Sequence, residues 1–165
     1  MDERQPFDLE SHVRRSTHGP CFICEMLRGN PEYIHHVVAE DADHVAFLSK
    51  YPTLRGYCLV APKRHIEDLA EDLSPMAYLE LQALVHRLSR ALKRVFEAER
   101  IYVLSLGSRQ ANSHIHFHVA PLPAGIPLAK QQYHALMAEE GILRLDATEM
   151  EQMAQTIRTA LAAQP

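Results

Sequence analysis

The sequence lacks the features that mark several classes of protein. It has no tryptophan, only three cysteines, and no apolar run that approaches the roughly 18 residues of a membrane span. An odd, small number of cysteines does not make a disulfide framework, and a chain of 165 residues can fold without one. We therefore expect neither disulfides nor a membrane protein.

An excess of basic residues is also missing. The chain has 17 Lys and Arg against 21 Asp and Glu, which gives a net charge of −4. Proteins that bind duplex nucleic acid neutralise its phosphates with clustered Lys and Arg, so duplex nucleic acid is not an expected partner. Residues 1–4 lack the basic start and apolar stretch of a signal peptide, and we expect a cytoplasmic protein.

The order of apolar patterns in the first half predicts an N-terminal arm, a short helix and three strands. Residues 1–20 show no sustained apolar period and are expected to form the arm. The helix begins near Cys21 and ends at Gly29, which Pro31 follows. Three short apolar and β-branched runs then predict antiparallel strands at residues 36–40, 44–48 and 57–61.

The second half predicts a long helix, two more strands and a helical tail. Ser74 is a good N-cap before Pro75, and the helix continues to about Glu99. Its expected core stripe consists of Met76, Leu79, Leu84, Leu88, Leu92 and Phe96. The remaining elements are strands at residues 100–106 and 113–122 and, in a C-terminal extension of residues 124–165, helices at about 130–140 and 148–163. Together these elements predict one α+β domain with about five antiparallel strands.

Histidine is frequent, and three of the 11 histidines alternate within one expected strand. The segment is His114-Ile115-His116-Phe117-His118. Side chains two residues apart on a strand share a face, so the three imidazoles point one way and the apolar residues between them point the other. The strand can therefore bury an apolar face and present three histidines to a cleft.

Three aligned imidazoles are compatible with a metal site, with phosphoryl chemistry, or with no function. Neutral imidazole is nucleophilic and leaves phosphorus readily, so one histidine can form a covalent intermediate while its neighbours bind phosphate oxygens. Spacing alone does not choose among these uses. Likewise, Cys21 and Cys24 have the spacing of two metal ligands, but alone they are equally well ordinary thiols or a redox pair.

Several motifs beyond the three histidines occur in a recognisable order. His114 to Ala120 has the pattern His-x-His-x-His followed by two apolar residues. The other motifs are Cys21-Phe22-Ile23-Cys24, Glu40-Asp41, Ala46-Phe47-Leu48, Pro52, Gly56 and Leu59 to His65. With these motifs the sequence resembles the histidine triad family over about residues 21–123.

The resemblance implies a nucleotide hydrolase with no organic cofactor. His116 would attack the α-phosphorus of a nucleotide and form a nucleotidyl-histidine intermediate that water hydrolyses. His118 would bind phosphate oxygens, and His114 would shape the site or bind a metal. The related transferase branch has Gln at the position of His118, so hydrolysis is favoured. Dinucleoside polyphosphates and nucleoside phosphoramidates are both implied substrate classes, with a slight preference for the former.

The resemblance also implies further site residues. Gln110 would hydrogen-bond the phosphate or the leaving group, and the loop of residues 107–112 would offer backbone N–H groups to the same phosphate. Ser49 stands where an acidic residue often binds the ribose. The remaining candidates are Ser108 and Ser113 for the phosphate, and Phe22 and Phe47 for the nucleobase.

In a subset of the family, the cysteine pair is completed by two histidines that correspond to His65 and His114. This implies a structural zinc ion, because four protein ligands leave no open position for water. Members commonly pair through the long helix and a strand edge, so the resemblance implies a homodimer. The alternative to an enzyme is a nucleotide-binding or regulatory module of the same fold with negligible turnover.

Overall fold

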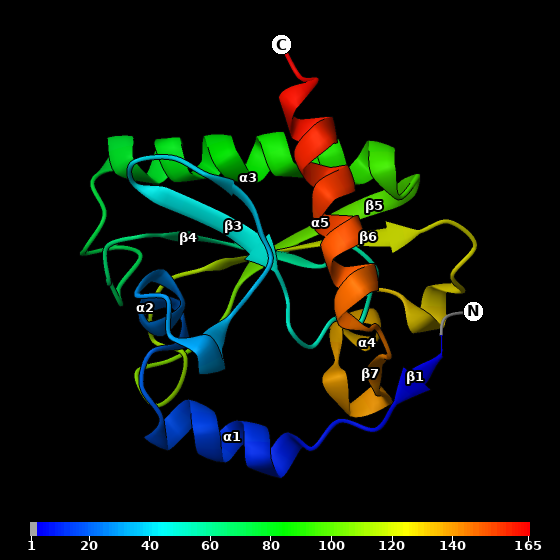
Figure 1. Cartoon of the computed structure of the whole chain (residues 1–165), viewed down its shortest axis with the longest axis horizontal. Helices are drawn as coiled ribbons and strands as arrows, with labels where there is room; N and C mark the ends of the chain where they lie inside the picture. Colours follow the sequence, from blue (N-terminus) through cyan, green and yellow to red (C-terminus); the bar gives the residue numbers. More distant parts are fainter. Residues whose placement is uncertain (1–2) are drawn as a thin grey trace.

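A five-stranded antiparallel sheet forms the centre of the molecule (Figure 1). The computed structural model describes residues 3–165, so Met1 and Asp2 of the expected arm lie outside it. In spatial order the strands are β2 (Val37–Glu40), β3 (His44–Leu48), β4 (Cys58–Pro62), β6 (Phe117–Pro123) and β5 (Ala98–Ser105). The predicted α+β fold with about five antiparallel strands is confirmed.

Helices α3 (Pro75–Val95) and α5 (Ala147–Ala162) cover one face of this sheet. The Ser74 hydroxyl accepts a hydrogen bond from the Ala77 N–H, as expected of an N-cap. Between helices and sheet lies the main core, which includes Leu88, Val60 and Ile157. The predicted stripe of α3 is wrong at its start, because Met76 and Leu79 are 64% and 59% exposed. Both lie on the solvent-facing side of the helix with the exposed Ala83 and His86, whereas its buried face begins at Leu81.

The other face of the sheet carries a smaller core under the short helix α2 (Phe22–Leu27). Residues alternate between the two faces along each strand: in β3, Val45 and Phe47 face α2, while Ala46 and Leu48 face the main core. Helix α2 ends before Gly29, which has a φ of 76°, as the sequence predicts. The 3-10 turn η1 (Pro31–Tyr33) then leads into β2.

The N-terminal arm contains two elements that the sequence did not predict. Strand β1 (Arg4–Gln5) pairs with β7 (Ile142–Leu143). Helix α1 (Leu9–His18) has Asp8 as its N-cap, and the Asp8 carboxylate accepts from the Ser11 N–H. Helix α1 has no buried residue. Its sequence therefore has no apolar stripe from which a helix could be recognised.

The C-terminal extension contains one of its two predicted helices. The second is confirmed as α5, which starts with a capping box formed by Asp146 and Glu149. The first is wrong: residues 128–140 form η2 (Leu128–Lys130), α4 (Tyr133–Leu136) and η3 (Ala138–Glu140). Gln132 has a φ of 57° and Met137 is extended, so a continuous helix is interrupted twice. In the described part of the chain, no helix is both long and apolar enough to cross a membrane.

Two glycines with the same backbone conformation provide a test of the packing before β4. Gly56 has a φ of 77°, and a Cβ there would lie 2.2 Å from Cε2 of Phe96; Gly29 has a φ of 76° with open space around it. We expect Gly56→Ala to lower the free energy of unfolding by about 2–4 kcal/mol, and Gly29→Ala by only about 1 kcal/mol. Urea unfolding of both variants measures this difference. Equal losses would show that contact with Phe96 adds nothing to the backbone strain.

Candidate active site and metal cluster

The three alternating histidines lie on the α2 face of the sheet, but only His118 is in a strand. β6 begins at Phe117, so the expectation of a strand from residue 113 is wrong. Before Phe117 the chain has no sheet partner and is held by the Ile115 N–H, which donates to the Ile66 carbonyl at 2.9 Å. The alternation still holds: Ile115 packs against the main core, while His114 and His116 are 1% and 3% exposed.

The ring of His116 is fixed by a single backbone hydrogen bond. Its Nδ1 lies 2.7 Å from the His114 carbonyl oxygen, which can only accept, so Nδ1 carries the proton. Burial lowers the pKa of His116, and the imidazole is therefore neutral at neutral pH with a lone pair on Nε2. The Phe22 ring contacts it edge-on with centroids 5.9 Å apart. This is the protonation state that a nucleophilic imidazole requires.

His118 is paired with a tyrosine that the sequence did not point to. The Tyr57 hydroxyl lies 3.1 Å from His118 Nδ1, and the rings of His118 and His116 have centroids 4.8 Å apart. Burial lowers the pKa of His118 to about 3 and raises that of Tyr57 to about 12. Both side chains are therefore uncharged at neutral pH. The sequence alone does not show that Tyr57 is close to His118. Their proximity follows from the strand register, which places Leu59, two residues after Tyr57, opposite His118.

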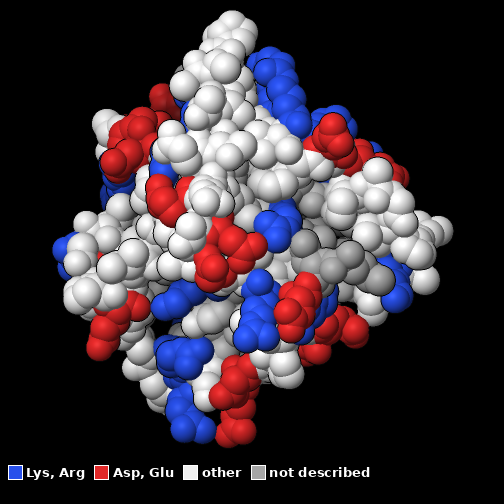
Figure 2. Space-filling view, turned by 45° about the vertical axis from the view of Figure 1, so that its right-hand side comes forward, with Lys and Arg blue, Asp and Glu red and all other residues white. Residues whose placement is uncertain are grey.

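All three histidines line a cavity of about 610 Å³ between α1, α2 and the sheet. Its volume lies within the range of about 300–1000 Å³ of small-molecule sites. Arg15, Lys50 and Arg109 are in its wall, against the single carboxylate of Glu32 among the described lining residues. Figure 2 shows Lys and Arg side chains gathered around a hollow in the lower part of the surface that is drawn. The cavity is thus cationic in a chain of net negative charge, and it suits an anionic ligand.

Most of the predicted binding residues reach this cavity. Phe22, Ser49, Gln110 and Ser113 line it. The Ser113 hydroxyl donates to Glu67 at 2.7 Å, and the Ser49 hydroxyl accepts from the Tyr51 N–H at 3.3 Å.

Two predicted binding residues are placed differently. Phe47 is fully buried behind Phe22 and His35, with ring centroids 6.3 and 5.1 Å away, so it supports the wall and does not line it. Ser108 lies in a tight turn, where its hydroxyl accepts from the Gln110 N–H. His35 lines the cavity and was missed, because one of two adjacent histidines gives no sequence signal for a pocket.

The loop of residues 107–112 is bonded largely to itself. The N–H groups of Ser108 and Ala111 donate to each other's carbonyl oxygens, and that of Gln110 donates to Ser108 Oγ. Gly107 is required at the start of the loop, since its φ is 112° and a Cβ would lie 2.4 Å from the Asn112 carbonyl oxygen. The expectation that this loop offers its N–H groups to a phosphate is therefore wrong, in this conformation, for those three residues.

A second cluster beside the cavity brings together Cys21, Cys24, His65 and His114. The four possible ligand atoms lie within 4.8 Å of one another. Cys21 Sγ is 3.4 Å from His114 Nδ1, and Cys24 Sγ is 3.3 Å from His65 Nδ1. Around a tetrahedral zinc ion, neighbouring ligand atoms are separated by about 3.3–3.8 Å. The two nitrogen–sulfur distances match that geometry.

The surroundings of the cluster orient both imidazoles toward it. His114 Nε2–H donates to the Pro62 carbonyl at 2.9 Å, and His65 Nε2 lies 3.0 Å from the Glu67 carboxylate. Each Nδ1 is thereby left to bind a cation, which is the usual role of such outer partners. Burial, followed by the neighbouring Cys21 thiol, raises the pKa of Cys24 to about 11, so a thiolate there needs a cation beside it. Cys58 is apart from the cluster and fully buried.

Comparison with known proteins identifies the domain that contains the three triad histidines. The HIT domain matches residues 30–124. An uncharacterised HIT-like protein of Mycobacterium tuberculosis is 32% identical over 148 residues, which are 88% of this chain and 95% of that protein. An adenosine 5'-monophosphoramidase of Schizosaccharomyces pombe is 32% identical over 106 residues, 62% of this chain and 74% of that protein.

A solved structure supports the same assignment. The zinc-bound histidine triad family protein of Mycobacterium smegmatis aligns with a TM-score of 0.68 and 26% sequence identity, over 86% of this chain and 93% of that chain. The triad segment, the sheet that carries it and the long helix behind that sheet all lie within the matched residues. The chain belongs to the HIT domain family.

Proposed function

We propose that this protein hydrolyses a nucleoside phosphate linkage, a phosphoanhydride or a phosphoramidate, through a nucleotidyl intermediate on His116. The observation that carries the proposal is the neutral, oriented imidazole of His116 in the wall of a cationic cavity. The phosphoramidase activity named for the Schizosaccharomyces pombe relative is of this kind. Among the described residues, no other histidine of the cavity combines such burial with a proton fixed on Nδ1 by a backbone carbonyl.

The reaction proceeds in two displacements. The Nε2 lone pair of His116 attacks the α-phosphorus, a P–N bond forms, and the bond from phosphorus to the leaving oxygen or nitrogen breaks. Water then attacks the same phosphorus and the P–N bond breaks. The leaving group departs in the first displacement and takes a proton from solvent. In the second, the water gives its OH to the nucleoside monophosphate and returns a proton to solvent, so His116 returns to its initial state.

His118 and Tyr57 stabilise the phosphate during both displacements. The protonated Tyr57 hydroxyl donates to His118 Nδ1, which leaves the His118 proton on Nε2 as a donor to a phosphate oxygen. Lys50 and Arg109 supply positive potential, and Gln110 lies in the same wall. Tyr57 is thus a positioning residue for His118.

The nucleoside occupies the part of the cavity lined by Phe22, His35 and Ser49. The two rings have centroids 5.8 Å apart and give an aromatic surface for a base, while the Ser49 hydroxyl faces the ribose. The remaining serines, Ser108 and Ser113, are phosphate contacts only if the loop rearranges, because both are engaged within the protein.

The cysteine cluster binds a structural zinc ion through Cys21, Cys24, His65 and His114. When bound, the ion supplies a crosslink between the N-terminal segment and the triad segment, and four protein ligands leave no position for substrate. A homodimer forms through the edge strand β5 and helix α3. Val103 on β5 and Met76 and Leu79 on α3 are exposed apolar residues that this contact would cover.

Removal of the nucleophile should abolish turnover. We expect wild type to cleave diadenosine triphosphate, adenosine 5'-phosphoramidate or both, and His116→Ala to lose at least about a thousandfold in kcat/KM because no P–N bond can form. Chromatography of released nucleotides measures this loss. His86→Ala, on the exposed side of α3, is the matched control. If wild type cleaves neither substrate, or His116→Ala equals wild type, the chain is a binding module.

Loss of the Tyr57 hydroxyl should affect rate and pH dependence without unfolding the site. We expect Tyr57→Phe to lower kcat/KM about tenfold, the equivalent of one hydrogen bond. The hydroxyl stabilises neutral His118, so its removal raises the His118 pKa and moves the acid limb of the pH profile upward. Kinetics from pH 3 to 8, a range that includes the low pKa of His118, test both effects. A lower rate with an unmoved limb would exclude a role through His118.

Zinc content tests the metal cluster independently of activity. We expect about one zinc per chain in wild type and in Cys58→Ala, and none in Cys24→Ala, because Cys24 belongs to the four-ligand set and Cys58 does not. Elemental analysis of the purified proteins gives the count. Zinc retained by Cys24→Ala would contradict the assignment. Brief chelation of wild type should lower its melting temperature and leave its initial rate close to that of the untreated protein.

A further inference from the structure

Helix α1 spans the cavity and is fixed mainly at its two ends. On the N-terminal side, β1 pairs with β7, and the Arg4 guanidinium donates to the carbonyls of Gly141 at 2.6 Å and Thr53 at 2.8 Å. On the C-terminal side, the chain passes directly into the cysteine cluster at Cys21. In Figure 1, α1 runs along the bottom of the molecule, apart from the sheet. None of its residues is buried, so it is not a packed core helix.

One side of α1 faces the cavity. Leu9, His12 and Ser16 line it, and these positions, three and four residues apart, share one face of a helix. Arg15 is beside them in the same wall. Val13 and Arg14 are exposed and lie outside the lining residues described. The cavity-facing side therefore carries an imidazole and a guanidinium where a core helix would carry aliphatic residues.

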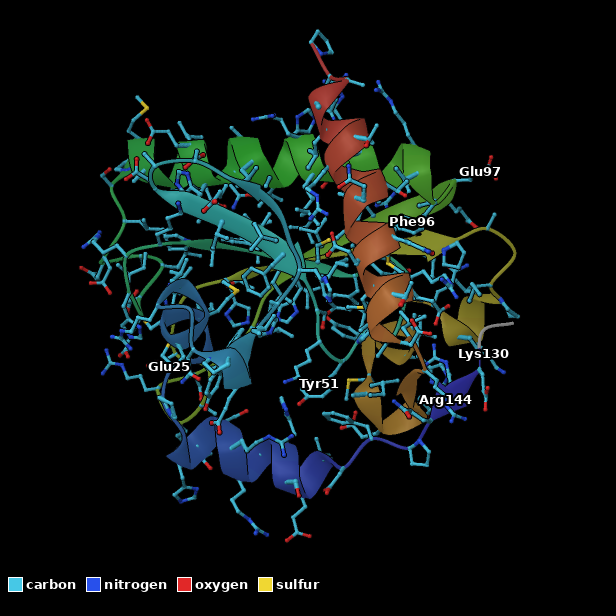
Figure 3. All side chains as sticks on the ribbon, in the orientation of Figure 1. Glu25, Tyr51, Phe96, Glu97, Lys130 and Arg144 are labelled. Atoms are coloured by element: carbon cyan, nitrogen blue, oxygen red, sulfur yellow. The ribbon has the colours of Figure 1, made fainter. Side chains whose placement is uncertain are left out.

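Three aromatic rings gather at this wall. The centroids of Phe7, His12 and Tyr51 are 5.2, 5.1 and 5.6 Å apart in pairs, and all three rings are half-buried. Tyr51 occupies the space between α1 and the rest of the protein (Figure 3). Burial lowers the pKa of His12, so its ring is uncharged at neutral pH and suited to stacking. The Arg15 guanidinium lies 3.5 Å from the Tyr51 hydroxyl.

An unpaired polar group lies in the same wall. Thr53 is 2% exposed, and its hydroxyl has no hydrogen-bond partner among the described residues. A buried hydroxyl without a partner is unfavourable unless a ligand or water reaches it. Because Thr53 lines the same cavity as α1, a ligand bound there could supply the missing partner.

The cavity thus has two aromatic surfaces, Phe22 with His35 and Phe7 with His12 and Tyr51. One nucleoside needs only one of them. We propose that Phe7, His12, Tyr51 and Arg15 form a second subsite, which binds the second nucleoside phosphate of a dinucleoside polyphosphate. The inference rests on the proposed function and assigns its substrate class. Phe7, His12 and Arg15 precede the matched domain, so the subsite is an addition to it.

The subsite predicts a selective effect on substrates that carry a second nucleotide. The rings stack on the second base, and the Arg15 fork binds a phosphate oxygen pair. We expect Arg15→Gln and Phe7→Ala to raise the KM for diadenosine triphosphate about tenfold more than the KM for adenosine 5'-phosphoramidate. Arg14→Gln and Val13→Ala, on the same helix but outside the cavity wall, should change neither KM. Equal circular dichroism and zinc content establish that the variants are folded.

Two results would overturn the subsite. If the KM values rise equally for both substrates, α1 contacts the nucleoside that both share or only supports the fold. If the KM values stay at the wild-type level, α1 has no role in binding. If wild type cleaves neither substrate, the proposed function fails. The subsite is then tested by calorimetry, which measures the affinity of wild type and Arg15→Gln for diadenosine triphosphate and for AMP. A tenfold loss of affinity for the dinucleotide alone in Arg15→Gln supports the subsite, and unchanged affinity overturns it.

Discussion

His114 makes two contacts that fix the geometry of both sites. Its backbone carbonyl accepts the Nδ1 proton of His116, and its ring, held by the Pro62 carbonyl, directs Nδ1 toward the cysteines. A change in the backbone at residue 114 would therefore move the proposed nucleophile, His116, and the proposed metal ligand, His114, together. This segment has no strand partner on either side. It is held by the hydrogen bond from Ile115 to Ile66, by the Ser105 hydroxyl, which donates to the His116 carbonyl, and by the core contacts of Ile115.

Burial determines the protonation of the triad. The pKa of His116 is lowered and that of His118 falls to about 3. The effect of burial is opposite to that of an anion in the cavity, which would favour the protonated imidazolium. Desolvation is the first cause in both cases, and the positive potential comes from residues nearer the solvent, such as Lys50 and Arg109. Neutral imidazoles and cationic side chains thus take different parts of the cavity, which in the proposed reaction would separate nucleophilic attack from charge stabilisation.

The sequence predicted features that depend on local periodicity and missed those that depend on register. Alternation placed His116 and His118 on one face, and the Ser74-Pro75 pair marked the start of α3. Tyr57 was missed because its distance from His118 depends on how β4 pairs with β6. Phe47 was assigned to the cavity because its motif does not show that a second layer of rings covers it.

Helix α1 could not be found from sequence for a related physical reason. Hydrophobic periodicity detects helices that pack on a core, whereas α1 faces a cavity with His12 and Arg15 and rests on anchors at its ends. One anchor is the cysteine cluster, so the zinc ion proposed there would stabilise the wall of the cavity as well as the triad segment. His114 would then connect the position of α1 to that of His116, and the proposed zinc ion would influence binding through the structure, without contact with the substrate.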